Sequence, residues 1–174
     1  EFCSRCIDII PDFVMHVNLS FVQIIKSDVK KDVLENISRH KAANNHYVLE
    51  ITESIQMDSN IAVKRVLDDF ISNGFLLAID DFGTGNATLN LLTELPIDEL
   101  KVDMSFVRGI QESKLNQVLV QAVVSCAHQL GYKSCIEGVE DKALFDYLHR
   151  YGSTYYQGYH FSRPVCLEDF KKLL

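Results

Sequence analysis

The hydrophobic residues of this chain gather in short runs that each end at an acidic or amide side chain. The runs 14–17, 47–49, 75–79, 100–102 and 134–136 are strand-like, and a sixth lies near 155–156. The polar residues at their ends are Asn18, Glu50, Asp80 with Asp81, Asp103, Glu137 and Gln157. Carboxylates are costly beside buried strands unless a cation gathers them. This repetition therefore predicts oxygen ligands, Glu50, Asp80 and Glu137 above all, that converge on one hard metal site.

Segments with helical periodicity separate these strand-like runs. Apolar positions recur on one face over 28–44, and further helices are expected over 59–73, 86–95, 111–130 and 141–151, with a last one from Leu167. Gly74, Gly131 and Gly152 are expected to end three of them. Strands that alternate with helices are typical of a parallel α/β sheet. Because no linker interrupts the alternation, residues 1–174 are expected to form one domain.

The position of the polar residues favours a TIM-type (β/α) barrel over an open doubly wound sheet. In such a barrel the active site lies at the carboxyl ends of the strands, whereas an open sheet gathers its ligand groups at one crevice. A closed barrel needs about eight strands and roughly 250 residues, but this sequence predicts about six of the β/α units. We therefore expect an incomplete barrel whose missing units precede residue 1, so that the chain is an N-terminally shortened piece.

Charge and cysteine content limit the ligands and the cellular compartment that we expect for this chain. The net charge of −7 argues against a surface that binds long nucleic acid through its phosphates. The odd count of five cysteines fits a reducing compartment, so we expect a cytoplasmic domain. The longest uncharged stretch, 115–132, carries too many polar residues for a membrane span. The six histidines show no metal-ligand spacing and are expected to be structural or exposed.

The segment 80–85, with the sequence DDFGTG, is the sharpest local signal. Strand alternation would send two adjacent carboxylates to opposite faces, but in a turn the first can bridge two metals while the second reaches one. Gly83 and Gly85 would let the loop approach a ligand without obstruction by a Cβ. Taken alone, an Asp-Asp pair also fits a solvated turn after a buried strand.

This segment resembles the signature loop of the EAL family of bacterial cyclic dimeric GMP (c-di-GMP) phosphodiesterases. Other segments resemble the family in the same order and cover nearly the whole chain. They are 17–20 (VNLS), 49–54 (LEITES), 95–103 (LPIDELKVD), 105–107 (SFV), 137–140 (EGVE) and 157–164 (QGYHFSRP). The chain is therefore identified by resemblance as an EAL domain.

The resemblance implies a two-metal hydrolase. It assigns Asn18, Glu50 and Asp80 to one divalent ion, and Asp80, Asp81 and Glu137 to a second. Mg²⁺ or Mn²⁺ suits an all-oxygen site of this kind. Two such ions activate a water for in-line attack on a phosphodiester. The implied reaction is hydrolysis of one bond of c-di-GMP to linear pGpG, in bacterial second-messenger signalling.

The resemblance also implies roles for residues around the metals. Lys101 resembles the lysine that holds the attacking water or the developing phosphorane charge. Glu137 is the candidate general base as well as a ligand, and Gln157 is expected to orient the water. The remaining implied roles are loop anchoring for Glu53, support of the ligands for Asp103 and Glu140, and substrate contact for Gly83, Thr84 and Gly85 together with Gln157.

Several residues keep an alternative interpretation. Asn18 could bond only backbone at a strand end, Lys101 could pair with Asp103 inside the barrel, and Glu140 could cap the helix that starts near Asp141. Aromatic residues near the C-terminus could stack on guanine, although core packing is expected for most of them. They are Tyr155, Tyr156, Tyr159 and Phe161.

The chain departs from the family pattern in two places. The Glu-Ala-Leu segment and the arginine after it, a metal ligand and a phosphate contact, do not occur in the sequence, so the piece is expected to be inactive alone. Residues 86–88 (NAT) stand where the family has an aromatic residue and two serines, in a region tied to dimerisation. The intact protein is expected to be a homodimer, fused to sensory or membrane segments that could tether it to the inner membrane.

Two other functions are compatible with the sequence. A non-catalytic EAL module would act as a c-di-GMP receptor or as a protein-interaction domain. Another barrel enzyme that uses Mg²⁺ at its strand ends, such as an enolate-forming one, is a third option. Retention of the acidic set favours the phosphodiesterase, because a docking module has no need of it.

Overall fold

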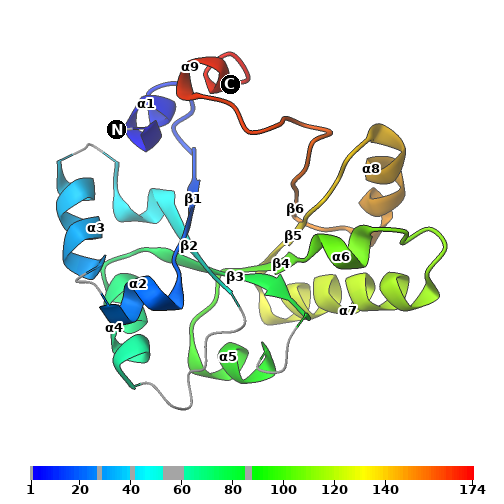
Figure 1. Cartoon of the computed structure of the whole chain (residues 1–174), viewed down its shortest axis with the longest axis horizontal. Coiled ribbons are helices and arrows are strands. Elements are labelled where there is room, and N and C mark those ends of the chain that lie inside the picture. Colours follow the sequence, from blue (N-terminus) through cyan, green and yellow to red (C-terminus); the bar gives the residue numbers. More distant parts are fainter. Residues whose placement is uncertain (1, 27–28, 40–41, 53–60, 85–87) are drawn as a thin grey trace. The chain divides into compact units, whose positions relative to one another are not determined.

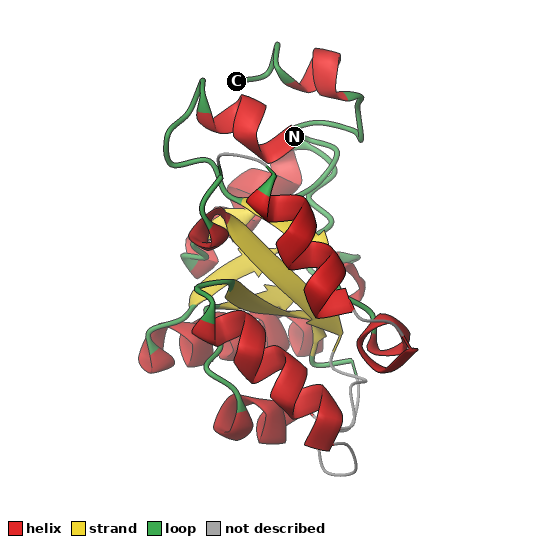
Figure 2. Ribbon diagram, turned by 90° about the vertical axis from the view of Figure 1, so that its left-hand side faces the viewer, coloured by secondary structure: helices red, strands yellow, loops and turns green. Residues whose placement is uncertain are grey.

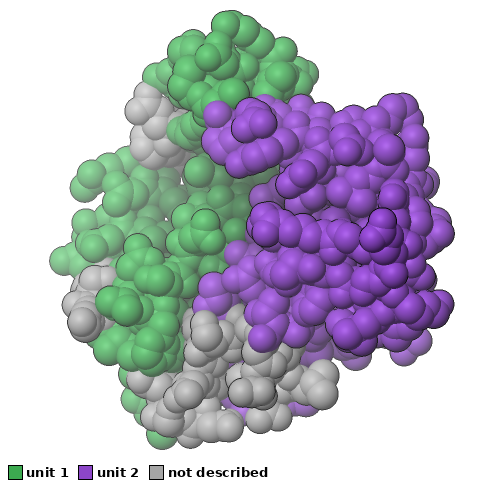
Figure 3. All heavy atoms as spheres, turned by 45° about the vertical axis from the view of Figure 1, so that its right-hand side comes forward, with its two compact units in different colours: residues 1–51, 55–77, 165–174 green, residues 52–54, 78–164 purple. Residues whose placement is uncertain are grey.

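Figure 1 shows the chain as a computed structural model, with strands that are joined by helices. The structure describes residues 2–26, 29–39, 42–52, 61–84 and 88–174. The chain folds into two compact units (Figure 3). Unit 1 comprises residues 1–51, 55–77 and 165–174, and unit 2 comprises residues 52–54 and 78–164.

Unit 1 is built around two parallel strands, β1 (Met15–Asn18) and β2 (Tyr47–Thr52). Their register runs from Met15 opposite Tyr47 to Asn18 opposite Glu50, so the two strands start together and β2 continues beyond the end of β1, to Thr52. The helices of this unit are α1 (Phe2–Ile7), α2 (Phe21–Lys26), α3 (Val29–Ser38), the 3₁₀ turn η1 (Asn44–His46), α4 (Ile61–Ser72) and α9 (Leu167–Phe170).

Part of the core of unit 1 is formed by apolar residues that recur on one face of α4. On α4 the buried residues are Val63, Leu67 and Phe70, spaced four and three apart on one face. The Phe70 ring meets Phe75 edge-on at 5.3 Å. The two ends of the chain also lie together in this unit, because Phe170 of α9 packs on Phe2 of α1 at 5.4 Å (Figure 1).

Unit 2 holds four neighbouring parallel strands in chain order. They are β3 (Leu76–Phe82, which starts in unit 1), β4 (Glu99–Val102), β5 (Lys133–Ile136) and β6 (Tyr155–Tyr156). The helices are α5 (Thr88–Glu94), α6 (Met104–Val107), α7 (Lys114–Leu130), α8 (Lys142–Leu148) and the 3₁₀ turn η2 (His149–Tyr151). Helix α7 packs on β4 and β5. Figure 2 shows the helices in red and the strands in yellow.

Parallel strands joined by helices confirm the predicted α/β class. Capping explains where the helices depart from the predicted bounds. Helix α7 starts at Lys114 rather than at 111, because the Ser113 side chain accepts a hydrogen bond from the Asn116 backbone, and it ends as predicted at Gly131, whose φ is 77°. The prediction for 141–151 was too long, since α8 stops at Leu148 and tightens into η2 before Gly152.

In unit 1 the helix predicted over 28–44 is shorter than expected. It ends at Ser38, and the 3₁₀ turn η1 follows, where the Asn44 side chain donates to the Asn73 carbonyl at 2.8 Å. The helices predicted over 59–73 and 86–95 are α4 and α5, and their predicted first residues lie outside the described residues. Among the helices that the structure describes, none has the length and apolar character of a membrane span.

Candidate metal centre

The end of strand β3 carries both aspartates of the 80–85 segment. Ile79 pairs with Leu100, but Phe82 pairs with Val102, so β3 holds one extra residue and forms a bulge against β4. Asp81 lies in this bulge with a φ of 56°, the only positive φ of a non-glycine residue in the described part of the chain. The strand therefore continues through both aspartates, where the sequence predicted a turn. The bulge breaks the alternation that would have separated the two carboxylates.

Three carboxylates meet at the ends of neighbouring strands in unit 2. One oxygen each of Asp80, Asp81 and Glu137 lies within 4.8 Å of the other two. Asp80 and Asp81 come from β3, and Glu137 directly follows β5. The Glu137 backbone N–H donates to the Val102 carbonyl at 3.2 Å, which holds this residue beside β4. The predicted convergence of Asp80 and Glu137 is therefore present within unit 2.

A buried lysine lies between two of these carboxylates. Lys101, on β4 between β3 and β5, is 3% exposed, and its Nζ is 3.0 Å from Asp80 Oδ1 and 2.7 Å from Glu137 Oε1. Asp80 and Glu137 are each 16% exposed. We call Asp80, Asp81, Lys101 and Glu137 the acidic cluster. Ion pairs of this kind hold a lysine in one place, because both partners are largely removed from water.

The acidic cluster carries uncompensated negative charge. Burial raises the pKa of Asp81, and the Asp80 and Asp103 carboxyls raise it further, while Lys101 acts in the opposite direction. When all groups are ionised, three carboxylates and one ammonium give −3 + 1 = −2. A divalent cation would balance this charge, and carboxylate oxygens are the ligands that hard cations prefer. The donor set therefore fits a hard divalent cation.

Asp103 has a structural use at the end of β4. Its side chain accepts a hydrogen bond from the Ser105 backbone N–H at 2.9 Å and caps α6. Burial acts to raise the pKa of Asp103, but hydrogen bonds from Ser105 outweigh it, so the pKa lies below its usual range. Asp103 thereby fixes the start of α6, directly after the strand that carries Lys101.

A cavity of about 280 Å³ adjoins the acidic cluster at Glu137. The Gln157 backbone is held there, because its N–H donates to the Ile136 carbonyl at 2.9 Å and its carbonyl accepts from Val139 at 3.0 Å. A Cβ at position 158 would overlap the Val139 backbone, so the chain needs a glycine to pass. The residues around this cavity are Met104, Arg108, Glu137, Gly138, Glu140, Gln157, Gly158 and Tyr159.

Glu140 lines this cavity and does not cap α8. The cap is Asp141, whose side chain accepts a hydrogen bond from the Leu144 backbone at 2.8 Å. The alternative cap interpretation of Glu140 was therefore wrong by one residue. Asp141 suits the position because its shorter side chain reaches the backbone of the first turn.

The glycine loop after Asp81 is closed by local contacts. Gly83 has a φ of 99°, and a Cβ there would lie 3.1 Å from the Phe106 ring, so close packing is a reason for glycine at this position. The Thr84 hydroxyl donates to the Asp81 carbonyl at 3.0 Å. Gly85 and Glu53, the predicted substrate contact and loop anchor, lie outside the described residues.

Unit 1 places Asn18, the last residue of β1, opposite Glu50 of β2. The Leu19 backbone N–H donates to the Glu50 carbonyl at 2.8 Å, and Asn18 is exposed. Glu50 is 7% exposed and its Oε1 lies 2.8 Å from Nδ1 of His16. The sequence prediction missed this histidine, although alternation puts His16 and Asn18 on one face of β1.

The C-terminal aromatic residues divide between packing and exposure. Tyr156 and Phe161 both meet the Phe145 ring edge-on, at 5.2 and 5.5 Å, and Phe161 is still 50% exposed. Tyr155 and Tyr159 are 43% and 55% exposed. The expected packing is therefore seen for Tyr156 and in part for Phe161, whereas Tyr155 and Tyr159 are exposed.

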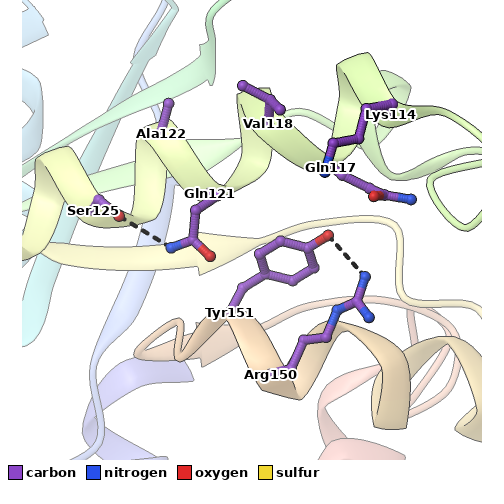
Figure 4. Close-up of a pocket in the computed structure, with 8 residues that line it drawn as sticks. All are labelled: Lys114, Gln117, Val118, Gln121, Ala122, Ser125, Arg150 and Tyr151. Atoms are coloured by element: carbon purple, nitrogen blue, oxygen red, sulfur yellow. Dashed lines mark hydrogen bonds between the residues drawn. The ribbon is translucent and has the colours of Figure 1, made fainter.

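A larger cavity, of about 550 Å³, lies between α7 and η2 and contains none of the predicted site residues (Figure 4). The Arg150 guanidinium stacks 3.7 Å above the Tyr147 ring and donates to the Tyr151 hydroxyl at 3.3 Å. The Gln121 amide donates to Ser125 at 3.0 Å. Among the described residues that line this cavity there is no carboxylate, so the cavity lacks the chemistry of the acidic cluster.

Parallel strands whose ends gather carboxylates around a buried lysine define a candidate metal-dependent enzyme of the α/β barrel class. The EAL domain profile matches residues 4–164, and the chain belongs to the EAL domain family. It is 32% identical over 94% of its length to the signaling protein YkoW of Bacillus subtilis, and covers 20% of that protein. It is 34% identical over 91% of its length to the bifunctional diguanylate cyclase/cyclic di-GMP phosphodiesterase MucR of Pseudomonas aeruginosa, and covers 23% of it. The chain thus spans about a fifth of the length of these relatives.

Solved structures confirm the predicted fold family. The PaMucR phosphodiesterase in complex with c-di-GMP matches with a TM-score of 0.89 and 32% identity, over 97% of this chain and 69% of that one. BlrP1 of Klebsiella pneumoniae, in a manganese/cyclic-di-GMP complex, matches with a TM-score of 0.82 and 30% identity, over 94% of this chain and 42% of that one. The chain therefore shares the TIM-like fold of EAL domains.

Proposed function

We propose that this chain forms the catalytic part of a metal-dependent phosphodiesterase that hydrolyses one bond of c-di-GMP to give linear pGpG. The observation that carries this proposal is the acidic cluster, three carboxylates within 4.8 Å around a lysine that is 3% exposed. It is supported by similarity to a c-di-GMP phosphodiesterase, MucR, and to BlrP1, which was solved with manganese and c-di-GMP.

Asp80, Asp81 and Glu137 are the residues of unit 2 that would hold a divalent ion, Mg²⁺ or Mn²⁺. The EAL resemblance adds Asn18 and Glu50 of unit 1 to the ligand set. Bound ions of this kind supply an activated water and offset negative charge on the phosphate oxygens. All five residues offer oxygen, which these cations prefer.

The residues around the ligands each have a task in the hydrolysis. The Lys101 ammonium, held by two carboxylates, would face the charge that develops on the phosphate. Glu137 would accept a proton from the attacking water while the oxygen of that water bonds to phosphorus. The P–O3′ bond then breaks, the O3′ oxygen takes up a proton from bulk water, and Glu137 releases its proton to bulk water. Gln157, whose backbone is fixed beside Glu137, would orient the water through its amide.

The proposal also covers the cellular location and the oligomeric state of the domain. We place the domain in the cytoplasm as a homodimer, joined to sensory or membrane segments. The much greater length of YkoW and MucR supports such fusion. Light scattering after size-exclusion chromatography tests the dimer.

The function is tested by hydrolysis of c-di-GMP with Mn²⁺, followed by chromatography of the pGpG product. The assay uses a polypeptide in which a Glu-Ala-Leu segment, as in other EAL domains, is joined ahead of residues 1–174. Asp80→Asn should lower turnover by at least about 100-fold, because an amide is a poor substitute for a charged ligand. The matched control, Asp146→Asn on the exposed face of α8, should retain activity. Saturable c-di-GMP binding without turnover would support the receptor function instead, and absence of both would contradict any c-di-GMP function.

A further inference from the structure

A histidine contacts the buried glutamate of unit 1. Nδ1 of His16 lies 2.8 Å from Oε1 of Glu50, and the two side chains are 33% and 7% exposed. An ionised carboxylate can only accept hydrogen bonds, so Nδ1 carries the proton and donates. The EAL resemblance assigns Glu50 a role but assigns none to His16.

The strand register places Asn18 opposite Glu50, with His16 on the same face of β1. Asn18 is the register partner of Glu50, and His16 precedes it by two residues on the same face of β1. The Glu50 backbone is held separately, by the Leu19 N–H at 2.8 Å. The histidine therefore restrains the orientation of the carboxylate itself, next to the exposed Asn18 amide.

We propose that His16 is a positioning residue that holds the Glu50 carboxylate in place for a divalent cation shared with Asn18. This inference rests on the proposed function, in which Glu50 is a metal ligand. A ligating carboxylate that is hydrogen-bonded by an outer partner loses less freedom when the ion binds. An imidazole suits this task because it donates a hydrogen bond without the permanent positive charge of a lysine, which would repel the ion.

The test is Mn²⁺ affinity of the 174-residue chain, measured by calorimetry together with the melting temperature. His16→Leu should weaken binding by about 10- to 100-fold, the usual effect of losing an outer partner of a metal ligand. His16→Asn should bind close to the wild type, because the Asn amide places a donor near the position of Nδ1.

The matched control is His46→Leu in the same unit. His46 donates through Nδ1 to the Phe13 carbonyl at 2.8 Å, so this variant loses a histidine bond of the same length that does not involve Glu50. It should melt earlier than the wild type and keep its Mn²⁺ affinity. A loss of affinity as large as that of His16→Leu would show that destabilisation alone explains the effect, and would overturn the inference.

A double-mutant cycle with Glu50→Gln separates positioning from direct ligation. His16→Leu should cause no further loss in the Glu50→Gln background, because the carboxylate that it positions is gone. An equal loss in both backgrounds, or no loss in the wild type, would overturn the inference and leave the proposed function standing. A wild-type chain that binds no Mn²⁺ would contradict the metal site of the proposed function, and the inference with it.

Discussion

Each unit buries carboxylates near the carboxyl end of its parallel strands, but the groups that contact these carboxylates differ between the units. In unit 1, Glu50 is 7% exposed and accepts a hydrogen bond from His16. In unit 2, Asp80 and Glu137 are 16% exposed and share the ammonium of Lys101. The first carboxylate accepts a hydrogen bond from an imidazole, whereas Asp80 and Glu137 both contact a buried ammonium.

This difference determines how the stability of each unit responds when a charged group is removed. The hydrogen bond from His16 lowers the cost of burying the Glu50 carboxylate. The acidic cluster keeps a formal charge of −3 + 1 = −2 even with its lysine. Removal of a group that pairs with or belongs to the Lys101 ion pairs should therefore destabilise unit 2, removal of the Asp81 charge should stabilise it, and removal of the Glu50 charge should have a small effect in unit 1.

Lys101→Met should give the largest effect on stability. Without the ammonium, Asp80 and Glu137 are left buried against one another, and breaking a buried pair by removing one partner costs about 3–5 kcal/mol. The measurement is urea unfolding of the 174-residue chain in the presence of EDTA. Mn²⁺ should recover part of the loss, because a cation would replace the missing charge.

The matched control for this variant is Lys142→Met. Lys142 also contacts a carboxylate, at 2.7 Å from Asp146, but its side chain is 75% exposed. Exposed pairs contribute at most about 1 kcal/mol. If both lysine variants lost the same stability, the ammonium of Lys101 would not be what holds the acidic cluster together.

Asp81→Asn should act in the opposite direction and stabilise the metal-free chain. The pKa of Asp81 is raised above its ordinary value of 3.8, first by burial and then by neighbouring carboxyls. The folded state thus favours the protonated form, and the stability that this contributes below pH 3.8 is lost as the pH rises through the folded pKa. An Asn carries no such charge, and it tolerates the φ of 56° at this position.

Thermal melts from pH 3 to pH 8 in EDTA test this prediction. At pH 7 Asp81→Asn should melt a few degrees above the wild type, and the two curves should converge near pH 3, where Asp81 is protonated in both states. With Mn²⁺ present the order should reverse, since the variant lacks a ligand. A variant that melts below the wild type at pH 7 in EDTA would show that Asp81 is not electrostatically strained.

The arrangement of strand ends was predictable from the sequence because parallel strands bring their carboxyl ends to one edge. The convergence of Asp80 and Glu137 followed from that rule, and the end of α7 followed from Gly131. Such features depend on local residue type and on a fixed topology. They need no knowledge of how two strands are aligned.

The features that were not predicted depend on register. The contact between His16 and Glu50 joins residues 34 positions apart, so it exists only because β1 and β2 align in one particular way. The bulge at Asp81 likewise arises from the pairing of β3 with β4. An aspartate in the left-handed region has no sequence signal comparable to that of a glycine.

The smallest effect is expected for Glu50→Gln. The Gln amide oxygen can still accept the hydrogen bond from His16, and the buried charge is removed with it, so the free energy of unfolding in EDTA should change by less than about 1 kcal/mol. The matched variant is Glu137→Gln, which leaves the buried Lys101 ammonium short of one carboxylate and should cost more. Urea unfolding of both variants measures the two losses in the free energy of unfolding. If Glu50→Gln cost as much as Glu137→Gln, the charge of Glu50 would be needed in the metal-free chain, and the hydrogen bond from His16 would not by itself account for the burial of this carboxylate.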